Sequence, residues 1–108
     1  MKFLCICQWG HSRSVALCRV LHGLGHGAVA IGECSNGGAI HPLSEWADKI
    51  LVLQPMFADA VPQQHRVKII DFDVGPDRWS NPYNQELLEI LRQMVTLNLP
   101  DLKQGDSL

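Results

Sequence analysis

A cysteine and an arginine near the start of the sequence, Cys7 and Arg13, have the types and the spacing that anion chemistry needs. Five residues separate them and Ser14 follows, so the segment has the pattern C-x5-R-S. The backbone N–H groups of so short a loop can surround one tetrahedral oxyanion. A helix beginning near Arg13 would direct its positive end to the same point, and a guanidinium can bind two oxygens at once. The pattern predicts a phosphate-binding loop above a cysteine sulfur.

Each fixed position of this loop has a chemical reason. The N–H groups and Arg13 would stabilise the thiolate form of Cys7, which makes it a nucleophile. Gly10 can adopt the positive φ that a tight anion-binding turn often requires. Ser14 is expected to donate a hydrogen bond to the sulfur when the sulfur leaves. The loop positions expected to contact substrate are Gln8, Trp9, Gly10, His11 and Ser12. A buried strand-end cysteine beside a solvated arginine is the alternative interpretation.

The elements around the loop can be read from the hydrophobic pattern. Residues 3–7 form a continuous apolar run, which predicts a buried strand. Residues 12–14 offer a helix N-cap, and apolar residues recur at helical spacing to about residue 24. Gly23, Gly25 and Gly27 cluster where this helix should end. The loop from Cys7 to Arg13, called the anion loop below, is therefore expected between the first strand and the first helix.

The rest of the chain alternates in the same way. Further strands are predicted at 28–31, 50–53 and 67–72, short helices at 42–47 and 56–64, a turn or loop at 35–38, a loop at 73–84 and a final helix at about 83–97. This alternation predicts an α/β fold, a three-layer sandwich with a four-stranded parallel sheet flanked by helices. Ligands of such sheets bind beyond the carboxyl ends of the strands, at a topological switch point.

Size, charge and composition exclude several other classes of protein. The chain has 108 residues, enough for one domain, which we place at 1–100 with a frayed tail at 101–108. The net charge is −2, which argues against a nucleic-acid partner. No apolar run approaches the roughly 18 residues of a membrane span, and no signal peptide is evident, so a cytoplasmic location is expected. The four cysteines and five histidines lack the spacing of a metal site.

The pattern resembles the low-molecular-weight class of cysteine-dependent tyrosine phosphatases, in which the C-x5-R-S loop follows the first strand. Residues 46–53 look like the helix end and third strand of small bacterial and phage members of this group. Residues 73–79, followed by 86–88, look like its acid loop, and the resemblance extends to about residue 97. It implies a phosphomonoesterase that acts on a phosphotyrosine protein or a small aryl phosphate through a phosphocysteine. No metal or cofactor is implied, and phosphate, vanadate or sulfate would bind the loop.

Such a reaction needs a carboxylic acid that protonates the leaving oxygen and later activates water. The candidates are Asp71 in the last strand, Asp73 at its end and Asp77 in the loop that follows. The resemblance favours Asp77, because the group's acid is followed closely by an aromatic residue, here Trp79. Asp73 is the alternative acid. Trp79 is also a candidate for flanking an aryl substrate, although packing beneath the loop is an equal alternative.

Two departures from the group keep other functions open. Gly10 stands where the class usually has Asn, and Ser12 stands where it has a second loop cysteine, so a local disulfide with Cys7 is not available. Whether Cys5 or Cys18 lies close enough to replace that thiol is left open. A thiol-dependent arsenate reductase is one alternative function, but it needs further thiols and no cysteine follows Cys34. A non-catalytic phosphate-binding module is the other.

Overall fold

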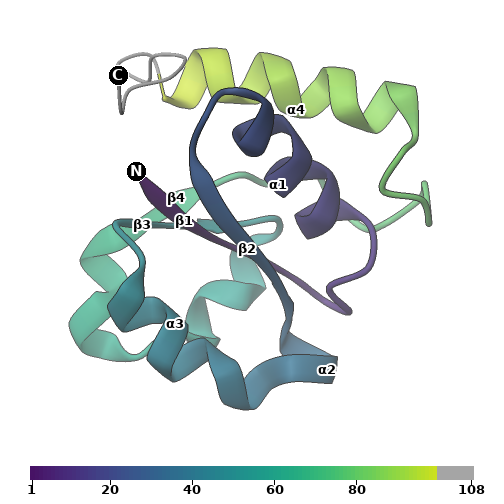
Figure 1. Cartoon of the computed structure of the whole chain (residues 1–108). Helices are drawn as coiled ribbons and strands as arrows, with labels where there is room; N and C mark the ends of the chain where they lie inside the picture. The colour runs from purple at the N-terminus through teal and green to yellow at the C-terminus, as the bar shows by residue number, and fades with distance from the viewer. Residues whose placement is uncertain (100–108) are drawn as a thin grey trace.

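Residues 1–99 are described by the computed structural model, and they contain a four-stranded parallel sheet with strand order β2-β1-β3-β4. The strands are β1 (Lys2–Cys7), β2 (Gly27–Gly32), β3 (Lys49–Val52) and β4 (Ile69–Asp71). All three pairings are parallel, with β1 between β2 and β3 (Figure 1). The predicted α/β fold with a four-stranded parallel sheet is confirmed.

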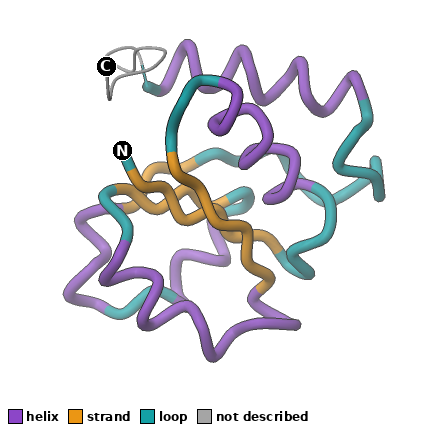
Figure 2. The backbone as a smooth tube through the Cα atoms, in the orientation of Figure 1, coloured by secondary structure: helices purple, strands orange, loops and turns teal. Residues whose placement is uncertain are grey.

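Helices cover both faces of the sheet, which gives the three expected layers. The long helices α1 (Arg13–Gly23) and α4 (Gln85–Asn98) lie together on one face. The opposite face carries α2 (Glu33–Asn36), α3 (Ile40–Trp46) and short 3-10 turns at Gly37–Ala39, Pro55–Ala60 and Gln63–Lys68 (Figure 2). Because β1 is covered on both faces, five of its six residues are buried, as a continuous apolar run requires.

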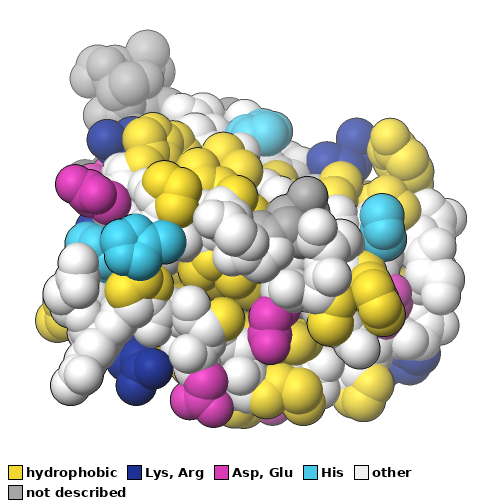
Figure 3. Space-filling model, turned by 90° about the horizontal axis from the view of Figure 1, so that it is seen from below, with side chains coloured by type: hydrophobic (Ala, Val, Ile, Leu, Met, Phe, Trp, Pro, Cys, Tyr) yellow, Lys and Arg dark blue, Asp and Glu magenta, His cyan; other side chains and the backbone are white. Residues whose placement is uncertain are grey.

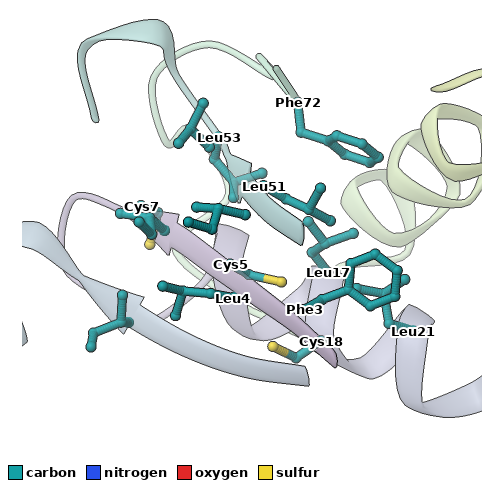
Figure 4. Close-up of a cluster of buried hydrophobic side chains, with 14 of the residues drawn as sticks. Phe3, Leu4, Cys5, Cys7, Leu17, Cys18, Leu21, Leu51, Leu53 and Phe72 are labelled. Carbon is teal, nitrogen blue, oxygen red and sulfur yellow. The ribbon is translucent and has the colours of Figure 1, made fainter. Parts of the chain in front are cut away.

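The core beneath α1 and α4 joins the sheet to the long helices. Phe3 of β1, Leu17 and Leu21 of α1 and Phe72 after β4 are all fully buried and lie in one cluster (Figure 4). Each such side chain contributes about 1.5–3 kcal/mol when it leaves water. This packing fixes the position of α1 on β1, and with it the loop that joins them.

The strand order places a topological switch point beside that loop. From β1 the chain moves to β2 on one side of the sheet and later to β3 on the other. Loops that follow β1 and β3 therefore diverge around a shared edge of the sheet, where open α/β sheets bind ligands. Cys7 is the last residue of β1, so the anion loop begins at this edge.

Three predicted boundaries differ from the structure. Residues 35–38, expected as a turn or loop, lie within α2 and the 3-10 turn after it, because Gly37 takes right-handed helical angles (φ −54°, ψ −32°) instead of a left-handed turn. The last strand spans only Ile69–Asp71, since 3-10 structure continues to Lys68. The helix expected at 56–64 is two 3-10 turns that Val61 and Pro62 separate. The tail predicted at 101–108 lies outside the described residues.

The surface carries mixed charges. On the face seen in Figure 3, acidic, basic and histidine side chains are dispersed among hydrophobic and polar ones, without a continuous basic patch. Within residues 1–99, no helix has the length and apolar character needed to cross a bilayer.

Candidate active site

Two glycines allow the loop after β1 to pack directly against the end of β2. Gly10 has a φ of +74°, and a Cβ there would lie 2.7 Å from the backbone nitrogen of Gly32. A Cβ on Gly32 would lie 2.2 Å from the carbonyl carbon of Trp9. The Cys34 amide adds a hydrogen bond to the Gln8 carbonyl, at 2.8 Å. Both glycines are therefore required by close backbone contact, and the loop has one well-defined path.

The path of the loop brings two polar groups to the sulfur of Cys7. The Gly10 N–H donates to Cys7 Sγ at 3.1 Å, and the Ser14 hydroxyl oxygen lies 3.0 Å from the same sulfur. Cys7 is 2% exposed, so these contacts are shielded from water. A thiolate at this position would be stabilised by hydrogen bonds instead of by solvent.

Cys5, on the same strand, has a contrasting environment. Its side chain and that of Cys18 point toward each other between β1 and α1, whereas Cys7 lies at the end of the strand (Figure 4). Burial raises the pKa of the Cys5 thiol well above its ordinary value, and the hydrogen bond with Cys18 acts in the same direction. All four cysteines of the sequence lie within residues 1–99 and carry free thiols. Cys5 is held as a neutral core residue.

Arg13 is buried at the first turn of α1, with its guanidinium held by groups from two other loops. Its Nη1 donates to Gln54 Oε1 at 2.6 Å and to the Gly75 carbonyl at 2.8 Å. Its Nε is buried and makes no hydrogen bond within residues 1–99. Both anchoring groups are neutral, so the positive charge of Arg13 is not cancelled by them. The edge that carries Nε is suited to two oxygens of an oxyanion.

Gln54 and Gly75 are site residues that sequence reasoning missed. A usable signal existed for Gln54, because it follows the buried run of β3 and so lies at the same sheet edge as Cys7. Gly75 takes part through its backbone carbonyl and has a φ of +76°. Because this contact is made by the backbone, the type of residue at position 75 gives no sign of it.

Asp77 is brought to the anion loop from the long segment between β4 and α4. Its Oδ2 accepts a short hydrogen bond from the Ser12 hydroxyl, and its Oδ1 accepts from the backbone N–H groups of Trp79 and Ser80, at 3.0 and 2.9 Å. Partial burial opposes ionisation of this carboxyl, but these hydrogen bonds and the charge of Arg13 outweigh it, so the pKa of Asp77 is lowered. The carboxylate is thus fixed at the rim of the loop.

The other two acid candidates are placed differently. Asp73 is exposed and its Oδ1 accepts a hydrogen bond from the Gly75 N–H at 2.8 Å, which closes a turn within its own segment. Asp71 is the exposed last residue of β4. The structure joins Asp77 to the anion loop by a side-chain hydrogen bond, and it joins Asp73 to the neighbouring backbone.

Trp79 is half-buried and lies in the connection between β4 and α4, residues 72–84, which also carries Asp77 and is called the acid segment below. Its side chain links this segment to α4. Its indole Nε1 donates to Glu86 Oε1 at 3.3 Å, and the Arg78 guanidinium lies over its ring at 4.2 Å. Arg78 also donates to Glu86 Oε1, at 2.8 Å. The hydrogen bond from Arg78, followed by that from Trp79, lowers the pKa of Glu86. These contacts place Trp79 between Arg78 and Glu86 and against the core.

The remaining predicted contact residues lie at the surface of the anion loop. Trp9 is 52% exposed, while its carbonyl accepts a hydrogen bond from the Ser35 hydroxyl. Gln8 and His11 are exposed, whereas Ser12 is buried. An aromatic ring therefore projects at the rim of a loop whose floor is Cys7.

Several solved phosphatases share this fold at low sequence identity. The tyrosine phosphatase Wzb from Escherichia coli K30, in complex with phosphate, is 15% identical, with 94% of this chain and 97% of that chain covered and a TM-score of 0.68. The Erwinia amylovora tyrosine phosphatase AmsI is 13% identical, with 94% of this chain and 92% of that chain covered and a TM-score of 0.69. The arginine phosphatase YwlE, in a mutant with a phosphorylated active-site serine, is 17% identical, with 94% of this chain and 97% of that chain covered and a TM-score of 0.58.

These neighbours are low-molecular-weight phosphatases, so the chain has the fold of that class. At such identities the likeness extends to the fold alone. No protein-family model and no curated protein sequence matches the chain.

Proposed function

We propose that the protein is a cysteine-dependent phosphomonoesterase. The observation that carries the proposal is the pair of contacts at the Cys7 sulfur, from the Gly10 N–H and the Ser14 hydroxyl, in a loop that ends at the buried Arg13, whose Nε has no hydrogen-bond partner among the described residues. A nucleophile below and donors around it fit a tetrahedral anion whose central atom is attacked in line. The fold shared with solved phosphatases supports the same conclusion.

The first step of the proposed reaction transfers the phosphoryl group to sulfur. The Cys7 thiolate attacks phosphorus, so an S–P bond forms as the bond to the leaving oxygen breaks. The loop N–H groups and Arg13 neutralise the charge on the three equatorial oxygens. Protonated Asp77 gives its proton to the leaving oxygen, which departs as a neutral phenol or alcohol.

The second step returns the enzyme to its starting state. Asp77, now ionised, takes a proton from a water molecule as the water oxygen attacks phosphorus. The S–P bond breaks, the Ser14 hydroxyl donates to the departing sulfur, and inorganic phosphate is released. The Gln54 amide and the Gly75 carbonyl hold the guanidinium in one orientation throughout, because both accept from Nη1.

The exposed ring of Trp9 supports an aryl phosphate as substrate. It stands at the rim of the loop, where the leaving group of a bound phosphomonoester must project, and aromatic rings favour stacking. Of the three structural neighbours described above, two are tyrosine phosphatases and one is an arginine phosphatase. We therefore propose phosphotyrosine or a small aryl phosphate, with phosphoarginine as the substrate to test beside it.

The two other functions predict different behaviour. An arsenate reductase must pass oxidation from Cys7 to a second thiol. Cys5 and Cys18 are enclosed in the core and only Cys34 is exposed among the described cysteines, so a relay would have to use Cys34. A binding module would hold phosphate without turnover.

The test is hydrolysis of para-nitrophenyl phosphate near pH 6, with a chelator present and vanadate as competitor. Cys7→Ser is the variant, and Cys5→Ser is the matched control, because it makes the same substitution on the same strand. We expect vanadate-sensitive turnover that Cys7→Ser lowers by at least about a thousandfold and that Cys5→Ser retains. Turnover that survives in Cys7→Ser contradicts the nucleophile, and phosphate binding without turnover in the wild type favours the binding module.

A further inference from the structure

Ser12 occupies a position where its side chain would ordinarily stabilise a helix. It is the N-cap residue of α1, and serine is among the preferred N-caps because its oxygen accepts from the N–H groups of the first turn. Here the Ser12 side chain makes no capping hydrogen bond. A cap is typically worth about 1 kcal/mol, so α1 begins without a contribution that its sequence offers.

The hydroxyl of Ser12 is used across the site instead. It donates to Oδ2 of Asp77, which lies 65 residues further along the chain. Ser12 itself is 4% exposed, and the α1 backbone holds it in place, since its carbonyl accepts from the Ala16 N–H at 2.8 Å. The hydrogen bond therefore joins a fixed residue of the anion loop to a carboxyl on an exposed segment.

The other carboxyl oxygen has no freedom to exchange with Oδ2. Oδ1 already accepts from the backbone N–H groups of Trp79 and Ser80. A proton carried by Asp77 must therefore be on Oδ2, because that oxygen is not committed to backbone donors. Ser12 contacts the oxygen that has to deliver the proton.

We propose that Ser12 is a positioning residue for the general acid, and that its hydroxyl holds Oδ2 of Asp77 over the anion loop in both protonation states. The inference rests on the proposed function, in which Asp77 protonates the leaving oxygen. When the carboxyl is ionised, the hydroxyl donates to Oδ2. When the carboxyl is protonated and its proton points to the leaving oxygen, the hydroxyl donates to a lone pair of Oδ2 that remains.

The contact sets the pH range of the acid as well as its position. A hydrogen bond to the ionised form lowers the pKa of Asp77, and loss of the hydroxyl raises that pKa toward the ordinary value of an aspartate. The charged or titratable side chains of the surrounding elements include Cys7, His11 and Arg13 from the anion loop and α1, Asp73 in the same segment, Arg78 and Glu86, which pair with each other, and Arg19 and Tyr83, which are in cation–π contact. Of these, Arg13 also favours ionisation of Asp77. The alkaline limb of kcat/KM, where the acid loses its proton, therefore moves to higher pH without Ser12.

The experiment compares Ser12→Ala with Ser12→Thr, which keeps a hydroxyl. Carboxyl 13C NMR titration follows Asp77 directly, and kcat/KM for phenyl phosphate is measured against pH. In Ser12→Ala we expect a higher Asp77 pKa, an alkaline limb shifted upward, a kcat lower by about tenfold on the plateau where Asp77 is protonated, and vanadate affinity within about threefold of the wild type. Ser12→Thr should restore all four. Any decrease in the melting temperature of Ser12→Ala then comes from the lost hydrogen bond to Asp77, because the Ser12 side chain makes no capping hydrogen bond.

Two results overturn the proposal. One is an Asp77 titration in Ser12→Ala that coincides with that of the wild type. The other is equal loss of kcat and vanadate affinity in both variants, which indicates a structural role in the loop. The NMR titration decides the question even if the wild type hydrolyses no phosphate ester, so failure of the proposed function is distinguishable. If Ser12→Ala does not fold, Ser12→Cys replaces it, because a thiol is a weak donor of nearly the same shape.

Discussion

The two loops that form the candidate site are built in opposite ways. The β1–α1 loop is short and its functional groups are buried: Cys7, Ser12, Arg13 and Ser14 are each at most 4% exposed. The β4–α4 segment, from Phe72 to Asn84, has no helix or strand, and Asp77 at its centre is exposed. The β1–α1 loop is fixed by backbone packing. The β4–α4 segment is held to the sheet by backbone hydrogen bonds at its start, from Phe72 and Val74, and to the anion loop by side-chain hydrogen bonds.

In the proposed reaction this difference assigns binding of the phosphoryl group to one loop and proton transfer to the other. In the proposed reaction the anion binds to a loop that close backbone contact between Gly10 and Gly32 holds against β2, which would give the phosphoryl group one position. The proposed acid, Asp77, is on the β4–α4 segment, which contacts the anion loop through the hydrogen bond from Ser12 to Asp77 and the hydrogen bond from Arg13 to the Gly75 carbonyl. Substitutions in the two loops should therefore affect different measurable quantities.

The largest effect within the acid segment is expected from Asp77→Asn. An amide cannot supply the proton, so kcat should fall by about 10² to 10⁴ for phenyl phosphate and less for esters with good leaving groups. Vanadate affinity should change little, because the anion loop is intact. Steady-state kinetics over a series of leaving groups measure this, together with vanadate titration.

Asp73→Asn is the matched control, since Asp73 lies in the same segment and hydrogen-bonds only to the Gly75 N–H among described residues. If Asp73→Asn produces the leaving-group dependence and Asp77→Asn does not, the acid has been assigned to the wrong residue.

Gly32→Ala should disturb the anion loop. A methyl group 2.2 Å from the Trp9 carbonyl carbon must displace the anion loop. We expect turnover to fall about 100-fold with weaker vanadate binding in parallel, since a displacement near 1 Å is enough for such a loss. Gly23→Ala is the control on α1: its Cβ meets nothing within 4 Å, and it should leave kinetics unchanged while adding about 0.5 kcal/mol of stability. Equal kinetics in Gly32→Ala and the wild type would refute the packing argument.

A smaller effect is expected from Glu86→Gln. The Arg78 guanidinium and the Trp79 indole both donate to Glu86, so the neutral side chain weakens the anchor of the acid segment on α4. We predict a decrease in kcat of about threefold with phosphate affinity retained, because exposed ion pairs contribute little. Glu89→Gln, which removes a carboxylate that pairs with Arg92 on the same helix, is the comparison. Similar kinetics in both variants would show that the anchor does not influence the acid.

The smallest effect concerns the strand that leads to the loop. Cys5→Ala removes a buried thiol from the core and should lower the free energy of unfolding by about 1 kcal/mol, with kcat within twofold of the wild type. Denaturant titration measures the first quantity and steady-state kinetics the second. A large loss of kcat would show that the core cysteine communicates with Cys7.

The sequence was informative where one local rule determined the structure. The apolar run of β1, the glycines after α1 and the C-x5-R-S spacing each predicted their elements, and the order of strands and helices predicted the parallel sheet. It failed at residues 35–38, because a glycine can be helical as well as left-handed.

Contacts between distant segments were beyond a single sequence. The sequence predicts that Ser12 caps the helix, because local spacing is the only guide to the role of a serine before a helix. In the structure its hydroxyl donates to Asp77 instead. The Gln54 amide on Arg13 depends on how β3 is aligned with β1, which the spacing along the chain does not specify. The C-x5-R-S spacing predicts which residues form the anion loop, whereas the contacts that hold those residues in place depend on the fold.

The position of β1 in the middle of the sheet has a consequence for protein synthesis. The ribosome makes Cys7 before Leu53 and Gln54, and at 5–20 residues per second roughly 2–9 s pass between them. During that interval β3 cannot pair with β1, and Arg13 has neither Gln54 nor Gly75 to hold it. The growing chain therefore carries Cys7, the proposed nucleophile, as a thiol that the second half of the sheet does not yet enclose, open to oxidants and to thiol exchange. A newly made molecule depends on the reducing capacity of its surroundings until translation has delivered the second half of the sheet.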